Sequence, residues 1–250
     1  MEIQIHKFGE IDSTNLEVIR RIKNNAPEGT LVQAESQISG RGRRGRAWNS
    51  PAGSNLYMSL LLRPQIPLET SSMMTLIMAL SCVEGIHKVT GLTCGIKWPN
   101  DLVYHKKKLV GILTEVSLLD DGAYALVCGV GINVSEQYFP AELEDKATSL
   151  WMEVKEKTDI DLLRDEILKC FVEHYELFLQ HQNLGFLKED YEKYLLNKNQ
   201  QVRVLDPKGE FQGVALGIDN QGQLLVKTKE DTVIPVYAGE VSVRGLYEYV

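Results

Sequence analysis

The feature that most constrains the fold is a change of pattern near Asn197. Before that residue, strand-like alternation and helix-like periodicity take turns along the chain. After it, only short strand-like segments separated by turn residues remain, which is typical of a small β-barrel of about fifty residues. We therefore expect an α+β domain over residues 1–197 and a barrel over residues 198–250, and a chain of 250 residues can bury a core for both.

Periodicity predicts the individual elements of both parts. Helices are expected from Thr14, where Thr14 and Glu17 match a capping box, and over residues 69–89 and 159–180. Strands are expected over residues 30–36, 55–63, 94–98, 109–119 and 123–134, with a turn at 120–122 and a closing segment at 191–197. The tail predicts strands at 202–205, 211–218, 224–228, 233–236 and 241–243, with turns at 206–209 and 219–222.

Charge and composition exclude several classes of protein. The net charge of −7, from 27 Lys and Arg against 34 Asp and Glu, argues against a general nucleic-acid coat. The four cysteines lie far apart without a C-x-x-C, which favours buried reduced thiols over disulfides or a zinc site. The N-terminus lacks signal-peptide features, and the most apolar run, residues 73–83, is too short to span a bilayer. We expect a soluble, cytoplasmic protein without a membrane partner.

Residues 40–46 read GRGRRGR and contain four arginines, where chain-average density gives about one basic residue. Arginine forks suit phosphate oxygens, and glycines let backbone N–H groups approach an anion closely. Such a loop can hold a polyphosphate and stabilise charge on a transferring phosphorus. A solvated basic loop or an RNA-binding Arg-Gly segment is the alternative. The run is single, lies between predicted strands and is followed by Trp48 and Pro51, which favours an ordered loop.

Residues 97–101 read KWPND, and HKKK follows at 105–108. Pro99 marks a turn. A lysine here could neutralise a carboxylate substrate during adenylation, and an aspartate could orient an amine or accept its proton. The alternative is a charged hairpin end in water, which we expect for Lys106 and Lys107. Lys108 directly precedes the apolar run LVGI, so its side chain could point inward.

Two further segments have a structural and a functional interpretation. Residues 12–15 read DSTN, which are the usual helix-capping residues, but the same geometry could hold a small polar group such as a ureido ring. Residues 129–133 read GVGIN and predict a central strand whose glycines allow close backbone approach, either for packing alone or for a ligand.

In this order, the segments resemble the biotin–protein ligases, also called biotin–[acetyl-CoA-carboxylase] ligases. The resemblance rests on residues 12–15, Gln37, residues 40–46 with Trp48, and residues 97–101, 108–111 and 129–133. It implies a catalytic α+β domain with a mixed sheet, related to class II aminoacyl-tRNA synthetases, followed by an SH3-like barrel. It also implies that biotin and ATP, with Mg²⁺, give biotinyl-5′-AMP and pyrophosphate. A lysine of a biotin carboxyl carrier protein then attacks the anhydride, forming a C–N bond and releasing AMP.

The resemblance also implies site residues. Those implied for biotin are Ser13, Thr14, Asn15, Gln37, Gly40, Arg41, Gly42, Lys108, Gly111, Gly129 and Gly131. Those implied for ATP are Arg43, Arg44, Arg46, Trp48, Asn100 and Asn133. The catalytic group comprises Arg41, Arg43, Lys108, which would bind the biotin carboxyl, and Asp101, which would orient the acceptor lysine. It names no metal ligands.

Some relatives of this kind carry an N-terminal winged helix-turn-helix. Because residues 12–15 begin almost at Met1, we expect a monofunctional ligase that is neither a repressor nor a DNA-binding protein. A homodimer through the central sheet stays open, with residues 114–119 as a candidate exposed strand. The alternatives are a lipoate or octanoate ligase of the same fold, and a non-enzymatic RNA-binding module.

Overall fold

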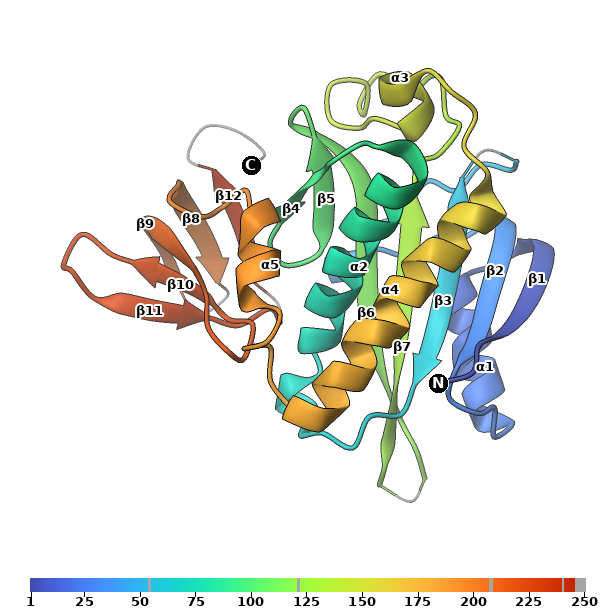
Figure 1. The fold of residues 1–250 in the computed structure, drawn as a ribbon, viewed down its shortest axis with the longest axis horizontal. Helices are drawn as coiled ribbons and strands as arrows, with labels where there is room; N and C mark the ends of the chain where they lie inside the picture. Colours follow the sequence, from blue (N-terminus) through green and yellow to red (C-terminus); the bar gives the residue numbers. More distant parts are fainter. Residues whose placement is uncertain (54, 121, 207–208, 240, 246–250) are drawn as a thin grey trace.

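The computed structural model describes residues 1–250 apart from 54, 121, 207–208, 240 and 246–250, and it contains two sheets (Figure 1). The first sheet has the strand order β1-β2-β3-β7-β6-β5-β4. Its strands are β1 (Gln4–Ile11), β2 (Thr30–Gln37), β3 (Leu56–Leu62), β4 (Gly95–Lys97), β5 (Asp101–Tyr104), β6 (Lys107–Leu118) and β7 (Tyr124–Ile132). The β1–β2 pair is parallel and the other pairs are antiparallel, so the sheet is mixed, as predicted.

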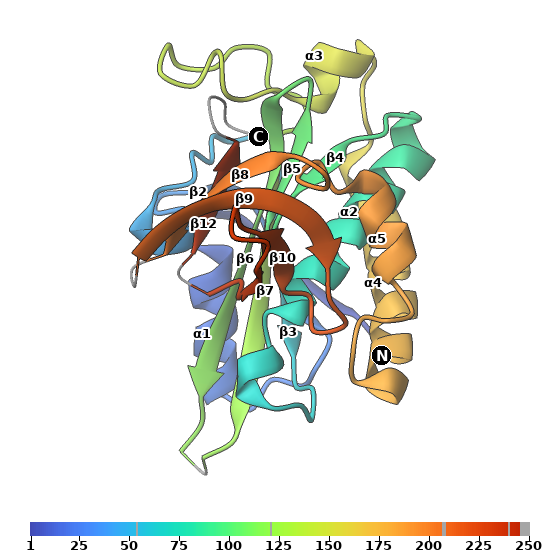
Figure 2. The ribbon, with the colours of Figure 1, turned by 90° about the vertical axis from the view of Figure 1, so that its left-hand side faces the viewer.

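Helices cover both faces of this sheet. Helices α2 (Met73–Thr90) and α4 (Ile160–His181) lie side by side on one face, and α1 (Thr14–Lys23) lies on the other (Figures 1 and 2). All seven residues of β3 are consequently buried, because neither of its faces meets water. Gly85 lets α2 and α4 approach closely, since a Cβ at Gly85 would lie 2.5 Å from Cγ1 of Ile167.

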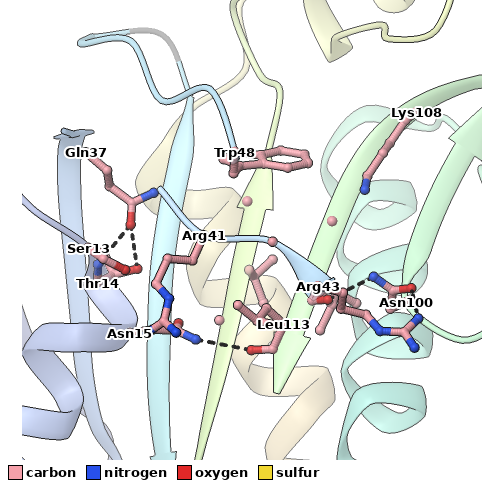
Figure 3. A pocket seen from close by; sticks show the side chains of 16 residues that line it. Ser13, Thr14, Asn15, Gln37, Arg41, Arg43, Trp48, Asn100, Lys108 and Leu113 are labelled. Atoms are coloured by element: carbon pink, nitrogen blue, oxygen red, sulfur yellow. Dashed lines mark hydrogen bonds between the residues drawn. The ribbon is translucent and has the colours of Figure 1, made fainter. Parts of the chain in front are cut away.

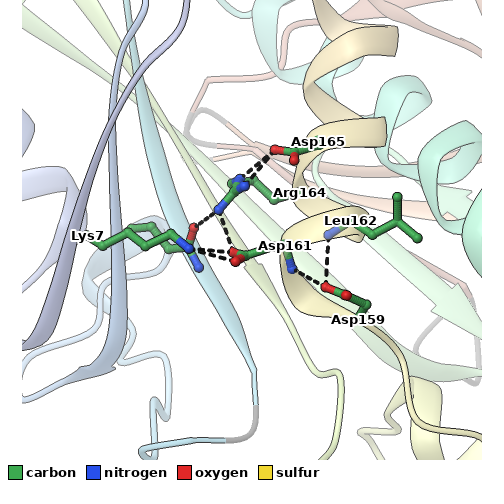
Figure 4. A network of polar contacts seen from close by, with 7 residues as sticks. Lys7, Asp159, Asp161, Leu162, Arg164 and Asp165 are labelled. Carbon is green, nitrogen blue, oxygen red and sulfur yellow. Dashed lines mark hydrogen bonds and ion pairs between the residues drawn. The ribbon is translucent and has the colours of Figure 1, made fainter.

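A polar network anchors the start of α4 to the edge of the sheet (Figure 4). Asp159 caps the helix by accepting hydrogen bonds from the backbone N–H groups of Asp161 and Leu162. Lys7 of β1 pairs with Asp161 at 2.7 Å, and Arg164, only 5% exposed, donates to Gln33 of β2. These bonds compensate the burial of the arginine charge and fix α4 against β1 and β2.

The second sheet is antiparallel, with the order β11-β10-β9-β8-β12. Its strands are β8 (Gln201–Asp206), β9 (Gly209–Ile218), β10 (Leu224–Lys227), β11 (Val233–Val236) and β12 (Ser242–Gly245), and β9 curves strongly (Figure 2). The predicted class is confirmed, a mixed sheet with helices followed by a small antiparallel unit. Among the described residues no pairing joins β11 to β12, so we describe an open curved sheet, not a closed barrel.

Several predicted details are wrong or incomplete. The capping box is wrong: Ser13, not Thr14, is the N-cap of α1, and Thr14 is the first helical residue. The sequence did not predict β1, β5 or the short helix α3 (Leu150–Val154), and the predicted closing segment 191–197 instead contains the end of α5 (Lys188–Tyr194). The predicted turns at 120–122 and 206–209 lie partly outside the described residues.

The apolar interior explains the cysteines and the most hydrophobic helix. All four cysteines are free and buried, as predicted, and burial raises the pKa of Cys94 and Cys128 to about 12. The region Leu68–Thr90 is longer than the apolar run of the prediction and by length and composition alone could cross a membrane. Its most apolar window is 72% buried within the protein, which is the environment of a core helix.

Candidate active site

A buried polar wall forms where the start of α1 meets the end of β2. Ser13, Thr14 and Asn15 are each less than 5% exposed. Gln37 accepts hydrogen bonds from the backbone N–H of Thr14 at 2.8 Å and from its hydroxyl at 3.1 Å. The Ser59 hydroxyl of β3 donates to Thr14 and Asn15. Because the bonds fix these groups before any ligand arrives, the wall can recognise a small polar ring.

Glycines of β6 and β7 form the floor. Gly111 pairs directly with Gly131, and Gly129 lies two residues before Gly131 along β7. A Cβ at Gly129 would overlap the Asn15 side chain, and one at Gly131 would lie 2.6 Å from the Trp48 ring. The predicted close approach at these glycines is thus confirmed, and the groups that approach are side chains of the site itself.

The arginine loop is ordered and crosses over the floor (Figure 3). An Arg41–Ala47 bridge, a Gly42 N–H bond to Arg46 O and a Trp48 N–H bond to Gly40 O close it. Arg44 adopts φ 58° and Gly45 φ 70°, which gives the sharp turn. From this loop Arg41 pairs with Glu115 of β6 at 3.0 Å, and Trp48 lies over Gly111 and Gly131.

Lys108 and Asp101 lie opposite each other at the β5–β6 hairpin. The Lys108 Nζ is 2.6 Å from Asp101 Oδ1 and 5.1 Å from the centre of the Trp48 ring. A bulge at this point of the hairpin shifts the register, and Lys108 is half-buried as expected. Lys106 is exposed, as predicted, and Lys107 is partly exposed and donates an exposed hydrogen bond to the Glu144 carbonyl, outside the central pocket.

These elements enclose a pocket, called here the central pocket (Figure 3). It is lined by Ser13, Thr14, Asn15, Gln37, Arg41, Gly42, Arg43, Trp48, Asn100, Lys108, Gly111, Ile112, Leu113, Gly129, Val130 and Gly131. The structure therefore brings together the residues implied for biotin except Gly40. Gly40 does not line the pocket, and a Cβ there would overlap the Trp48 carbonyl and lie 2.6 Å from Ser50 Oγ.

Two of the cavities that adjoin the central pocket hold further predicted residues. A side pocket shares Trp48 and Lys108 with it and adds Arg46, Asn133 and Phe139. A basic cleft between the two sheets contains Arg43, Arg44, Arg46, Lys97, Asp101, Lys108 and Arg244. Among the predicted residues, Arg44, Arg46, Asp101 and Asn133 thus line these neighbouring cavities and not the central pocket.

The basic cleft strongly perturbs one lysine. Lys97 is 6% exposed, and burial lowers its pKa to about 7. Asp101 opposes that shift, while the positive charges of Lys108, Arg244 and Arg46 add to it. A cluster of cations around one carboxylate is suited to a polyanion, because an anion would relieve their mutual repulsion.

The sequence missed several contributors. Ser59, Glu115 and Arg244 complete the site from strands β3, β6 and β12. Glu115 could have been noticed as an acidic residue in an apolar strand, but Ser59 and Arg244 carry no local signal. Among the described residues no group of three or more His, Cys, Asp or Glu side chains could hold a metal ion.

Comparisons with known proteins extend over the whole site. A model described as the biotin/lipoate A/B protein ligase family matches residues 9–133, and one described as the biotin protein ligase C-terminal domain matches residues 199–244. The chain is 42% identical over 235 residues to the bifunctional ligase/repressor BirA of Bacillus spizizenii, covering 92% of this chain and 71% of that protein.

One further relative and one solved structure point to the same family. A biotin–[acetyl-CoA-carboxylase] ligase of Mycobacterium tuberculosis is 31% identical over 245 residues, covering 95% of this chain and 88% of that one. The solved structure of a biotin protein ligase from Aquifex aeolicus in complex with biotin and ATP matches with a TM-score of 0.84 and 30% identity. That match covers 97% of this chain and 99% of the other.

Proposed function

The chain belongs to the biotin/lipoate A/B protein ligase family, and we propose that it is an ATP-dependent biotin–protein ligase. It would first join biotin and ATP into biotinyl-5′-AMP with release of pyrophosphate. It would then transfer biotin to a lysine of a biotin carboxyl carrier protein of acetyl-CoA carboxylase. The observation that carries this proposal is the central pocket, in which one chamber joins a fixed polar wall to Arg41, Arg43 and Lys108.

The polar wall would bind the ureido end of biotin, and the cations would bind its carboxylate end. The ureido ring has donors and an acceptor, which match the hydroxyls and amides of Ser13, Thr14, Asn15 and Gln37. The carboxylate would extend past the glycine floor to Lys108. Trp48 covers that floor, so it must move when a ligand of biotin's size enters the central pocket, whose free volume is about 50 Å³.

Adenylation brings together two anions, which repel strongly at low dielectric unless cations compensate. Lys108 would hold the biotin carboxylate, and Arg43 with the basic cleft would hold the triphosphate, with Arg44 and Arg46 as further ligands. A carboxylate oxygen attacks the α-phosphorus, the bond to the bridging oxygen breaks, and pyrophosphate leaves. Positioning and charge stabilisation then provide most of the rate enhancement.

In the second step the acceptor amine attacks the acyl carbon, and AMP leaves with the electrons of the acyl–phosphate bond. Asp101 lies 2.6 Å from Lys108, so it would orient the amine and take its proton close to the reacting carbonyl. The side pocket, with Trp48, Phe139 and Asn133, would hold the adenine base. Arg41 would cover the mixed anhydride and keep water away from it.

Magnesium is also part of the proposal. The phosphate side of the site contains cations around Asp101, and the described residues offer no cluster of acidic ligands. These residues do not form a metal cage, so Mg²⁺ would arrive bound to ATP phosphates, which is its usual arrangement with nucleotides.

Organisation and location complete the proposal. A division near residue 197 is supported by the element order, because every strand of the second sheet begins at or after Gln201, beyond the last helix, α5, which ends at Tyr194. A homodimer is supported by β6, because β5 and Asn100 engage only residues 107–112 and no strand among the described residues pairs with the rest of that edge. A cytoplasmic location is supported by the free, buried cysteines. The absence of repressor activity stays a prediction.

A lipoate ligase is the second candidate, because the family model includes lipoate ligases. Ligand-dependent melting separates the two candidates. A ligand at one hundred times its Kd adds about 2.7 kcal/mol, which raises the Tm of a chain of this size by roughly 5–10 °C. We expect that rise with biotin and none with lipoate. A rise with lipoate alone would assign the other substrate.

A further inference from the structure

Arg43 of the arginine loop is held by the second sheet. Its Nη2 donates to the backbone carbonyls of Ala238 at 3.0 Å, Gly239 at 2.5 Å and Val241 at 3.0 Å. We call these three carbonyls the cradle. Its Nη1 donates to Asn100 Oδ1 at 2.9 Å, so one guanidinium joins the loop, the KWPND turn and the segment between β11 and β12.

The chemistry of the cradle suits a residue that must keep its charge available. Burial lowers the pKa of Arg43 and the charge of Asp101 opposes that shift, but the groups that contact the guanidinium directly are carbonyl oxygens and not a carboxylate. A carboxylate partner would neutralise that cation, whereas carbonyl dipoles stabilise it without cancelling its charge. The positive field of Arg43 therefore remains for an incoming anion.

The geometry also leaves part of the guanidinium for a ligand. Arginine has five N–H donors in a planar fork. The bonds described occupy the Nη2 side and one Nη1 hydrogen, which leaves Nε and the other Nη1 hydrogen. Arg43 lines both the central pocket and the basic cleft, so these donors belong to a side chain at the junction where the phosphates would pass.

Hydrogen bonds connect the sheet that carries the cradle to the first sheet. The Trp98 indole N–H donates to Gly222 O at 3.0 Å in a buried contact, and Leu196 N–H donates to Ile96 O at 2.9 Å. Glu192 of α5 accepts from the Ile218 N–H of β9. The Trp98 bond joins the second sheet directly to the KWPND turn, and the other two join it to β4 through α5 and Leu196, so the cradle can hold Arg43 at a defined place.

We infer that the second sheet positions Arg43 for phosphate through the cradle, which makes it a working part of the adenylation site. This inference rests on the proposed function. The opposite arrangement, in which the cradle withholds Arg43 from ATP, would have the reverse effect on the rate when the cradle is displaced. The direction of the rate change therefore separates positioning from inhibition.

The test is an insertion of two glycines directly after Gly239, compared with the same insertion directly after Glu230 in the β10–β11 turn. The β10–β11 turn belongs to the same sheet and lies away from Arg43. It is closed by a hydrogen bond from the Thr228 N–H to the Thr232 carbonyl. We expect the insertion at Gly239 to lower kcat for pyrophosphate release by about 10- to 100-fold. The KM for biotin should stay within about twofold, and the control insertion should leave both constants unchanged.

A double-variant cycle tests whether the effect passes through Arg43. In an Arg43→Ala background the insertion at Gly239 should add less than about twofold, because the positioned group is gone. An equal loss in both backgrounds, or a rise in kcat, would overturn the inference. If thermal melting shows that the insertion impairs folding, Arg43→Lys replaces it as the test variant. Lysine keeps the positive charge, but it cannot bind the cradle carbonyls and a phosphate at the same time. Full activity of Arg43→Lys would also overturn the inference.

Trypsin gives a readout that is independent of catalysis. Displacing the cradle should speed cleavage at residues 43–46, while the control insertion should not. If the unaltered chain released no pyrophosphate with biotin and ATP, the proposed function would fail, and this cleavage rate would still decide whether the cradle anchors the loop. Equal cleavage rates in both insertion variants would count against anchoring.

Discussion

Individual side chains in this site have roles that follow from their charge and surroundings. Lys108 is the cation at the mouth of the glycine floor, and Arg43 is the cation between the central pocket and the basic cleft. Both are supported by defined partners, Asp101 for Lys108 and the cradle with Asn100 for Arg43. At this scale, removing one charge should affect the chemical step far more than the fold.

We predict that Lys108→Ala and Arg43→Ala each lower the rate of pyrophosphate release by roughly 100- to 1,000-fold, because each removes charge stabilisation in a dry site. Far-ultraviolet circular dichroism should show a persistent fold. Lys106→Ala, on the same hairpin but exposed, is the matched control and should retain activity. Near-normal rates for both site variants would refute their assigned roles.

Lys97 predicts a pH effect on phosphate binding. Burial lowers its pKa to about 7, so at pH 8 it is mostly neutral in the ligand-free protein. A bound polyphosphate favours the protonated form and raises that pKa, so binding should take up a proton near pH 8 and weaken as the pH rises above 7. Calorimetry of pyrophosphate binding in buffers of different ionisation enthalpy measures this uptake. It should disappear in Lys97→Gln; unchanged uptake in that variant would assign it to another group.

At the scale of elements, the glycine floor and the loop above it form one structural unit. Arg41 ties the loop to Glu115, and Trp48 lies directly on Gly131. The floor works because β6 and β7 pair glycine with glycine, which leaves room for a ring above the sheet.

Gly131→Ala should therefore displace Trp48 and block the pocket. The added Cβ would lie 2.6 Å from the ring, which requires the indole to shift. We expect biotin affinity to fall by about tenfold or more, equivalent to at least about 1.4 kcal/mol. Isothermal calorimetry measures the loss, and tryptophan fluorescence reports the shift. Gly9→Ala is the control, because a Cβ there has open space; equal affinities of the two variants would contradict this account of the floor.

Much of the element order follows from sequence pattern, and the misses have physical causes. Long apolar segments such as those of α2, β3 and β7 are buried on all sides, so their periodicity or apolar content predicts them. β1 is an edge strand with exposed positions on both faces, and β5 has four residues, so neither contains a clear alternation. The capping box failed because Gln37 and Ser59, distant in sequence, engage Thr14.

At the site too, contacts between residues that are distant in sequence limit what the sequence can predict. The motifs predicted most residues of the central pocket, because the groups that meet the floor lie in short contiguous runs. The Arg41–Glu115 pair, the position of Arg244 and the cradle depend on strand pairing and on how the two sheets pack. No local pattern contains that information.

At the scale of the whole molecule, the two sheets share one cleft. The net charge is −7, yet the cleft collects Arg43, Arg44, Arg46, Lys97, Lys108 and Arg244 around Asp101. The basic site is therefore local on a protein whose net charge is negative, and residues of both sheets form it. A small polar chamber beside a basic cleft is an arrangement that would suit adenylation of a carboxylate.

The most direct test of the central claim is a mass measurement. The chain is incubated with biotin, ATP, Mg²⁺ and a biotin carboxyl carrier domain, and the carrier is analysed by intact mass and peptide sequencing. We predict a gain of one biotinyl group on a single lysine, dependent on ATP and lost with Lys108→Ala. An unmodified carrier, or a carrier modified with lipoate but not with biotin, would contradict the account.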